Sequence, residues 1–176
     1  MSMLTDALEQ FVEHLARLNR PAVWWLRPGV PADRLPPDAP ESVLHWFGWA
    51  DGLEGFDGQR FDDASVIPGY TLVSVEEAAR LMPAYAGDPV LGTHWLPLLT
   101  TASADLYAAV WVPGEEAQVA GVDAGEPTEI EFASIDRMVD FFNACYDTGT
   151  FSVDDTQRLM ADPGRYDELY EEISGA

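Results

Sequence analysis

Apolar residues in the first twenty positions recur with the period of an α-helix. Five of them follow one another at alternating steps of four and three residues: Leu4, Leu8, Phe11, Leu15 and Leu18. These steps place the five side chains on one side of a helix, and Pro21 cannot continue it. We therefore predict a core-facing helix over residues 3–19, with His14 on its polar side.

The next segment is rich in proline before the pattern becomes helical again. Residues 21–37 hold five prolines around Trp24 and Trp25, which predicts an extended chain that lays both indoles on the body of the protein. Asp38 is placed to cap a second helix, with Glu41 positioned to return the capping interaction. This helix carries Trp46 and Trp49.

A loop rich in glycine and aspartate follows over residues 51–63. Its composition predicts an exposed connection and invites comparison with a calcium-binding EF-hand. An EF-hand loop needs alternating oxygen ligands, then a glycine and a final acid at fixed positions. No register of these residues satisfies that spacing, so we expect no metal ion there.

The middle of the chain has the pattern of β-strands. Residues 69–73 predict a short strand, and Ser74 and Glu77 have the spacing of a capping box for a helix that ends at Pro83. Four short apolar segments follow, separated by Pro, Gly or Asp: residues 94–99, 105–112, 117–122 and 128–132. Their short connections predict an antiparallel meander. The second segment is apolar on both faces, which predicts a central strand, whereas the fourth alternates and belongs near an edge.

The C-terminal part returns to helical patterns. Ser134 is placed to cap a helix whose apolar face includes Cys145. Further along, Ser152 and Asp155 have the same cap spacing. Asp162 precedes a last helix. We thus predict C-terminal helices over residues 152–173. The fold class is α+β: one domain over residues 1–176, with an antiparallel meander of four to six strands packed with surrounding helices.

Charge is the most unusual property of the composition. The chain has 31 Asp and Glu against nine Arg and no Lys, a net charge of −22. Nucleic acid and anionic membrane would be repelled, so we expect neither as a partner. Residues 113–176 hold 16 carboxylates and three Arg. Solubility and an acidic face directed at a basic partner both explain this excess, and both remain open.

The start of the chain and the cysteine content bear on where the protein works. The N-terminus has no cationic stretch followed by an apolar one, and no segment reaches the roughly 18 apolar residues of a membrane span. We therefore expect a cytoplasmic protein. Cys145 is the only cysteine, which excludes an internal disulfide. A packed core thiol is favoured over a reactive one.

Signatures of catalysis are missing from the sequence. There is no Gly-x-Ser-x-Gly, no phosphate-binding Gly-Lys loop and no Cys-x-x-Cys. His14, His45 and His94 lie in different predicted elements, and none has a second metal ligand at helical spacing. We therefore expect a protein that is not an enzyme and has no metal site and no cofactor.

Several short motifs occur in an order that resembles one family. They are Leu35-Pro36, the helix ending in Asp51-Gly52, the strand that passes into Ser74-Val-Glu-Glu-Ala78, and Trp95-Leu-Pro-Leu98 followed by Asp105. Over residues 35–145 this order resembles the SUKH superfamily of Smi/Knr-type proteins. One departure is that Ser103-Ala104 precedes Asp105, where many members have glycines. The predicted helices over residues 3–19 and 152–173 would be extensions of the family pattern.

The resemblance implies a SUKH-like α+β domain that acts as a protein-binding module. Bacterial members are similar to immunity proteins that neutralise toxins, many of them nucleases, and fungal members are similar to regulators of cell-wall synthesis. Our first hypothesis is therefore an immunity protein whose acidic surface binds a basic toxin enzyme. The alternative is an intracellular regulatory or scaffold protein that binds an endogenous partner.

Two sets of residues are candidates for these roles. The partner-binding set combines large aromatic residues with an acidic loop, although burial of both tryptophans in the core is an equally good interpretation. It comprises Trp46, Trp49, Asp51, Asp57, Asp62 and Asp63. A third hypothesis is a small-molecule enzyme or ligand carrier, with a cleft lined by Trp95, Asp105 and Tyr107 beside His94.

Overall fold

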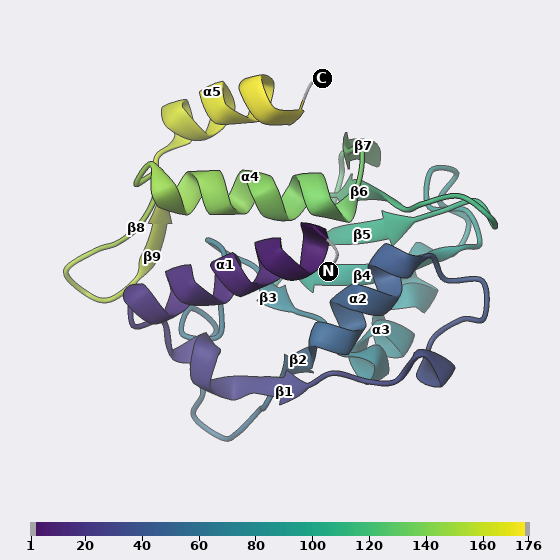
Figure 1. Ribbon diagram of the computed structural model, residues 1–176, viewed down its shortest axis with the longest axis horizontal. Coiled ribbons are helices and arrows are strands. Elements are labelled where there is room, and N and C mark those ends of the chain that lie inside the picture. Colours follow the sequence, from purple (N-terminus) through teal and green to yellow (C-terminus); the bar gives the residue numbers. More distant parts are fainter. Residues whose placement is uncertain (1–2, 175–176) are drawn as a thin grey trace.

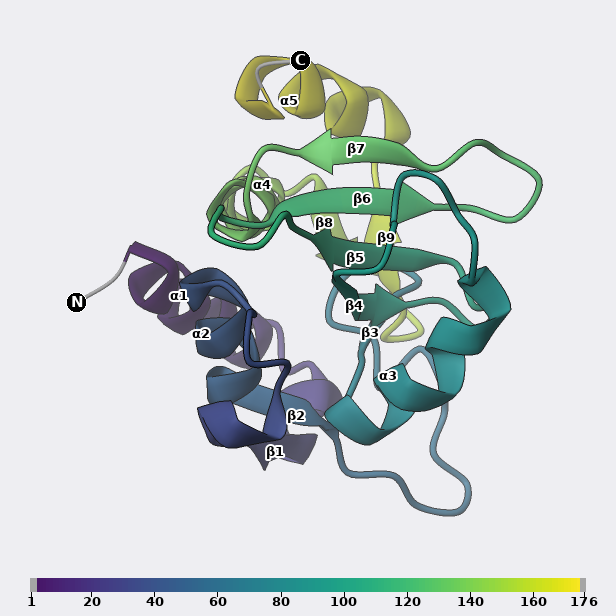
Figure 2. The ribbon, with the colours of Figure 1, turned by 90° about the vertical axis from the view of Figure 1, so that its right-hand side faces the viewer.

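A five-stranded antiparallel sheet forms the centre of the computed structural model, which describes residues 3–174. The strand order follows the chain: β3 (Thr71–Leu72), β4 (Trp95–Thr100), β5 (Leu106–Val110), β6 (Gln118–Val122) and β7 (Glu129–Phe132). Figure 2 shows this meander with β7 at one edge. The predicted α+β class and meander are confirmed, and β5 is the central strand, as its two apolar faces predicted.

Helices cover both faces of the sheet. On one side α1 (Met3–Arg17) lies beside α4 (Ile135–Asp147), with α2 (Glu41–Trp49) next to α1 and α5 (Pro163–Ser174) packed on the far side of α4 (Figure 1). On the other side lie α3 (Val75–Leu81) and the short 3₁₀ helix η3 (Met82–Tyr85). Within residues 3–174, no helix is long and apolar enough to cross a membrane.

The alternation of side chains along the strands divides the apolar residues into two clusters. Tyr107 and Ala109 of β5 face the large core with α1, α2 and α4, whereas Leu106 and Ala108 face a smaller cluster with Trp95. Cys145 is fully buried in the large core, where burial raises the pKa of its thiol to about 12. The thiol is therefore a packed core group, as its surroundings predicted.

Two of the predicted helix caps are confirmed. The Oγ of Ser74 accepts a hydrogen bond from the amide of Glu77 (3.0 Å), and that of Ser134 accepts one from the amide of Arg137 (3.1 Å). The cap predicted at Asp38 is wrong, because α2 begins after Pro40 and has no side-chain cap.

Asp38 instead joins its loop to the sheet. Its Oδ2 lies 2.6 Å from Nδ1 of His94 and accepts a hydrogen bond from Nε1 of Trp111 (3.3 Å). Asp38 thus ties the proline-rich segment to residues that flank β4 and β5.

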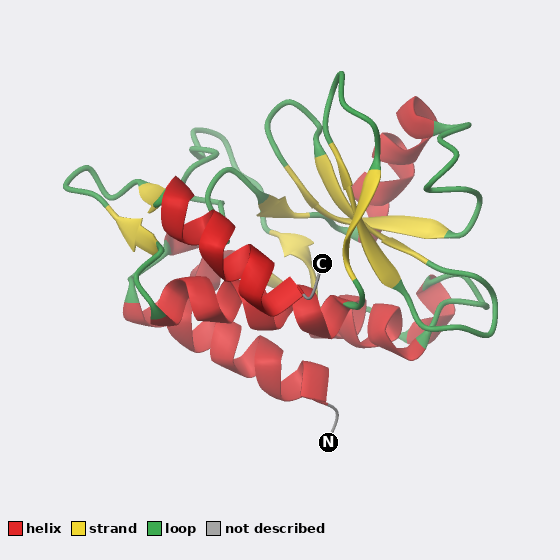
Figure 3. Ribbon diagram, turned by 90° about the horizontal axis from the view of Figure 1, so that it is seen from above, coloured by secondary structure: helices red, strands yellow, loops and turns green. Residues whose placement is uncertain are grey.

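The helix predicted near Ser152 is wrong. Residues 151–161 form a two-stranded antiparallel hairpin of β8 (Phe151–Val153) and β9 (Leu159–Ala161), which lies apart from the five-stranded sheet (Figure 3). Asp154 shapes its turn, since Oδ1 accepts hydrogen bonds from the amides of Thr156 (2.8 Å) and Arg158 (3.0 Å). An aspartate that bonds the amides just after it favours a turn as readily as a helix start.

The prediction that His14 lies on the polar side of its helix is also wrong. It is 3% exposed between α1 and α4, stacked on Tyr146 with a ring separation of 5.4 Å. Its Nε2 lies 3.3 Å from the carboxylate of Asp147. Burial lowers the pKa of His14 more than this carboxylate raises it.

Candidate functional site

The acidic loop over residues 51–63 is fixed at its start by an aspartate–glycine pair. β2 (Ala50–Leu53) pairs with β1 (Leu26–Pro28), and Oδ1 of Asp51 accepts a hydrogen bond from the first amide of α3, that of Val75 (2.8 Å). Gly52 has φ +68°, and a Cβ there would lie 2.9 Å from the backbone nitrogen of Ser74. The pair docks β2 on the start of α3, which explains why glycine is required.

Asp51 therefore serves as an internal anchor. It is 6% exposed, and its second oxygen lies 3.8 Å from Nη2 of Arg27. Its predicted contact with a partner is not supported by this geometry.

The two predicted tryptophans differ in burial. Trp46 is 3% exposed and packs edge-on against Trp49 (5.4 Å), which is partly buried against Phe11 (6.3 Å). Because its indole is buried, Trp46 is a core residue and offers no surface to a partner. This agrees with the core interpretation that the sequence left open.

The three remaining predicted aspartates differ in how far their side chains are exposed. Asp57 is exposed beside Gly58, which has φ +84°. Asp62 and Asp63 are partly buried, and the carboxylate of Asp62 lies 3.8 Å from Nη2 of the buried Arg20. Only Asp57 among the six predicted contacts is exposed.

The exposed aromatic residues near this loop are different ones. Trp24 is 73% exposed and Phe56 is 50% exposed. Phe56 packs edge-on against Trp25 (5.0 Å), and the amide of Glu54 donates to the carbonyl of Trp25 (2.8 Å). These contacts bring two chain segments side by side, and we call their residues the aromatic surface: Trp24, Trp25, Glu54, Phe56 and Asp57.

The expectation that both indoles lie on the body of the protein is wrong for Trp24. Residues Pro21–Trp25 form a 3₁₀ helix (η1) rather than the predicted extended chain. With about three residues per turn, successive side chains of a 3₁₀ helix diverge. Ala22 is consequently buried, Trp25 is partly buried and Trp24 points to solvent. The two neighbouring tryptophans are the only sign of this surface in the sequence. Which of them faces solvent depends on the 3₁₀ turn.

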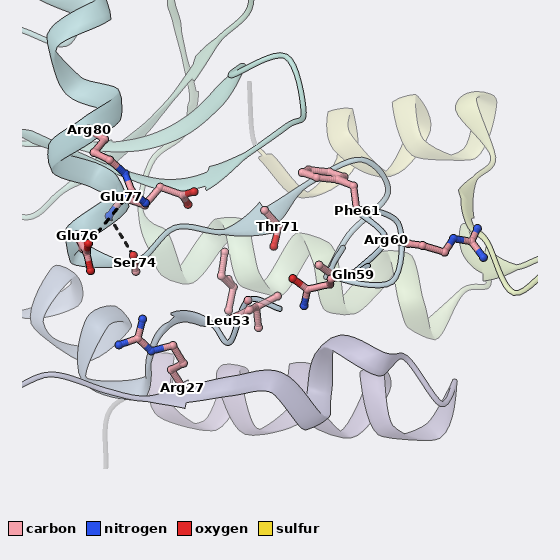
Figure 4. Close-up of a pocket in the computed structure, with 13 residues that line it drawn as sticks. Arg27, Leu53, Gln59, Arg60, Phe61, Thr71, Ser74, Glu76, Glu77 and Arg80 are labelled. Carbon is pink, nitrogen blue, oxygen red and sulfur yellow. Dashed lines mark hydrogen bonds and ion pairs between the residues drawn. The ribbon is translucent and has the colours of Figure 1, made fainter. Parts of the chain in front are cut away.

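A groove of about 430 Å³ separates the acidic loop from α3. Figure 4 shows Arg27 and Arg80 at one end and Gln59 and Phe61 at the other. Arg80 lies 3.7 Å from the carboxylate of Glu76. Burial raises the pKa of the neighbouring Glu77. Three Arg and two Glu line this groove, so it is far closer to neutral than the chain as a whole.

The hydroxyl groups of this groove lie apart from any histidine. Among its described lining residues the hydroxyls belong to Ser74 and Thr71, and Ser74 is committed to the cap of α3. A hydroxyl nucleophile needs an adjacent base to activate it, and no histidine lines the groove. Within residues 3–174, no group of three or more His, Cys, Asp or Glu is placed to hold a metal ion.

The cleft predicted around Trp95 is not formed. Trp95 belongs to the small cluster on the α3 side of the sheet, whereas Tyr107 packs on the α4 side against Phe142 (6.0 Å). Asp105 is held in a turn, where its Oδ1 accepts from the amide of Ala124 (3.0 Å). Residues on opposite faces of one sheet cannot line one cavity, so this geometry does not support the third hypothesis.

In comparisons with known proteins, no family model and no curated protein sequence matches this chain.

Proposed function

We propose that this protein is a binding module that holds a basic protein partner against its aromatic surface. The observation that carries the proposal is the exposure of Trp24 (73%) and Phe56 (50%) on a framework fixed by backbone hydrogen bonds. Large aromatic residues with little freedom to lose dominate the energetics of protein interfaces. Glu54 and Asp57 beside them supply a charged rim.

The overall charge supports a basic partner. A net charge of −22 attracts a cationic protein over about a Debye length and accelerates its encounter. Charge complementarity contributes to the rate and the specificity of association, whereas desolvated aromatic anchors contribute most of the affinity. The two features therefore have separate and complementary roles.

The particular function that we propose is that of an immunity protein, which occludes the active site of a toxin enzyme. A nuclease is a suitable target, since a surface that binds phosphate is basic.

The resemblance to the SUKH superfamily supports this proposal through the positions of its motif residues. Leu35 is buried, Asp51 and Gly52 dock on the start of α3, and Ala104 adopts φ +65° where many members have glycine. These motif residues maintain the fold and lie outside the aromatic surface.

Co-expression tests this function. The purified protein is first used to capture its partner from its own lysate at low and high salt, and the captured protein is identified. The captured protein is then expressed with and without this chain. The proposal expects a basic protein that is lost at high salt, stops growth when expressed alone and is neutralised by this chain.

Two controls make the experiment decisive. Trp24→Ala combined with Phe56→Ala should abolish capture and protection, whereas Ile130→Ala should leave both unchanged, because Ile130 is exposed (41%) on the distant strand β7. A captured protein that is harmless when expressed alone would favour the regulatory alternative. A neutral, salt-insensitive partner would contradict the electrostatic part of the proposal.

A further inference from the structure

A second groove runs along the hairpin strand β9. It has a volume of about 530 Å³ and lies between residues 158–161 and the segment from Arg60 to Gly69. A smaller hollow of about 350 Å³, which contains Tyr70, Tyr107 and Tyr166, shares Pro68 and Ala161 with this groove. The two hollows adjoin each other at these residues, and we call them together the β9 groove.

The backbone of β9 is open on one side. The amide of Asp162 donates to the carbonyl of Thr150 (2.9 Å), and that of Asp154 donates to the carbonyl of Arg158 (2.9 Å). Because antiparallel pairing alternates along a strand, the N–H and C=O groups of Leu159 and Ala161 point away from β8. In residues 3–174, β8 is the only strand that pairs with β9. An unpaired edge of this kind accepts another extended chain.

A buried arginine fixes the two walls of the groove relative to each other. Arg20 is 1% exposed. Its Nη1 donates to the carbonyl of Gln157 (3.0 Å) in the hairpin turn, and its Nη2 donates to the carbonyls of Asp62 and Ser65 (3.5 Å for Ser65) in the opposite wall. A groove whose walls are already held in place costs a ligand little ordering of the protein.

The lining of the β9 groove combines apolar side chains with charges of both signs. Asp62 lines the groove but lies 3.8 Å from the buried Arg20, and Asp167 lines the adjoining hollow. Phe61 (39% exposed) and Met160 (42% exposed) lie on opposite walls. Arg60 and Arg158 also line the groove, and Figure 4 shows Arg60 pointing away from Arg27 and Arg80. Two of the nine arginines of a strongly acidic chain thus lie beside an open strand edge.

We propose that the β9 groove binds an extended segment of a partner protein, which adds a strand to β9 and directs a carboxylate toward Arg60 and Arg158. The open amides and carbonyls select an extended backbone, Phe61 and Met160 select apolar side chains, and the guanidinium groups select a carboxylate. A second copy of this chain is disfavoured as the occupant, because two chains of net charge −22 repel each other. This groove is separate from the aromatic surface.

Selection with random peptides tests this proposal without the natural partner. Phage-displayed random heptapeptides are selected on the purified protein, and an enriched peptide is synthesised with a fluorophore for polarisation measurements. We expect the enriched sequences to alternate apolar residues and to carry Asp or Glu. Amide hydrogen exchange at Leu159 and Ala161 should slow when the peptide binds.

Matched variants locate the binding. Arg60→Gln with Arg158→Gln should weaken peptide binding about tenfold or more, since each charged hydrogen bond is lost. Arg34→Gln with Arg137→Gln makes the same change of charge at exposed positions elsewhere and should leave binding unchanged.

Ala161→Pro removes one outward donor at a strand edge, where proline is tolerated, and should also weaken binding. Circular dichroism confirms that the variants are folded, and the exchange measurement on the unaltered chain does not depend on any substitution. Trp24→Ala should not affect the peptide, which separates this groove from the proposed function.

Three results would overturn the proposal. One is that no peptide is enriched. Another is a peptide whose affinity is the same for the wild type, the arginine variant and Ala161→Pro. The third is a dimer in solution in which the amides of Leu159 and Ala161 are already protected, because a second copy would then occupy the groove.

Discussion

Replacing Arg20 with methionine should lower the free energy of unfolding by about 3 kcal/mol. The side chain is 1% exposed and joins the end of α1 to two distant segments through the carbonyls of Gln157, Asp62 and Ser65. Methionine retains much of the apolar stem and removes every donor. The three carbonyls then lose this donor, although that of Asp62 still accepts a hydrogen bond from the amide of Ser65 (3.1 Å).

The magnitude follows from the geometry of these contacts. The contact with Ser65 is long (3.5 Å), so the contacts with Gln157 and Asp62 carry most of the energy. Hydrogen bonds from a charged donor contribute roughly 1.5–3 kcal/mol each. Part of this is offset because methionine is easier to bury than a guanidinium group. The net value of about 3 kcal/mol lies at the lower end of the cost of removing one partner from a buried ionic contact.

Urea unfolding followed by tryptophan fluorescence measures this change. At a typical denaturant dependence, a loss of about 3 kcal/mol lowers the midpoint by about 1.5 M. Arg34→Met is the matched control, because Arg34 is exposed, and its effect should stay within about 0.5 kcal/mol. If Arg20→Met were as stable as Arg34→Met, the assignment of Arg20 as the link between the two walls would be refuted.

Three further changes test other parts of the structure. Asp51→Ala should destabilise the protein by about 1–2 kcal/mol in thermal unfolding, since the first amide of α3 loses its acceptor; unchanged stability would argue against the anchoring role. Gly52→Ala should cost more than Gly58→Ala, because both have positive φ but only Gly52 has Ser74 within 4 Å of the added Cβ; equal losses would argue against the close approach. Burial lowers the pKa of His14, so the folded state favours the neutral imidazole. The stability that neutral His14 contributes is therefore lost as the pH falls below the ordinary histidine pKa of about 6.5. The stability advantage of the wild type over His14→Gln should therefore be smaller at pH 5.5 than at pH 7.5, and an advantage that grows at low pH would contradict this sign.

The order of the strands and the two long core helices could be predicted from the sequence because their signals extend over many residues. α1 and α4 repeat an apolar step along their length, and the four segments of the meander are each bounded by Pro, Gly or Asp. The helix predicted at Ser152 depended on a single cap spacing. Asp154, between the two predicted cap residues, bonds the amides of a hairpin turn instead.

The candidate site was predicted less well, because it depends on the direction of individual side chains. The prediction of an exposed glycine-rich loop is correct at Asp57. Asp51 and Trp46, in contrast, point inward, because they contact residues far away in the sequence. Trp24 and Trp25 are adjacent in the chain, and only the 3₁₀ turn of η1 decides which of them faces solvent. The β9 groove was missed entirely, since its two walls are separated by about ninety residues in the sequence and held together by Arg20.

The affinity of the captured partner for Trp24→Ala is the sharpest test of the proposed aromatic surface. Titration calorimetry should give a dissociation constant about 30-fold weaker than that of the wild type, which corresponds to the loss of about 2 kcal/mol expected for a central aromatic anchor. Ile130→Ala should bind as the wild type does. Equal affinities for the wild type and Trp24→Ala would refute the proposed surface, because the most exposed aromatic residue of the described chain would then play no part in binding.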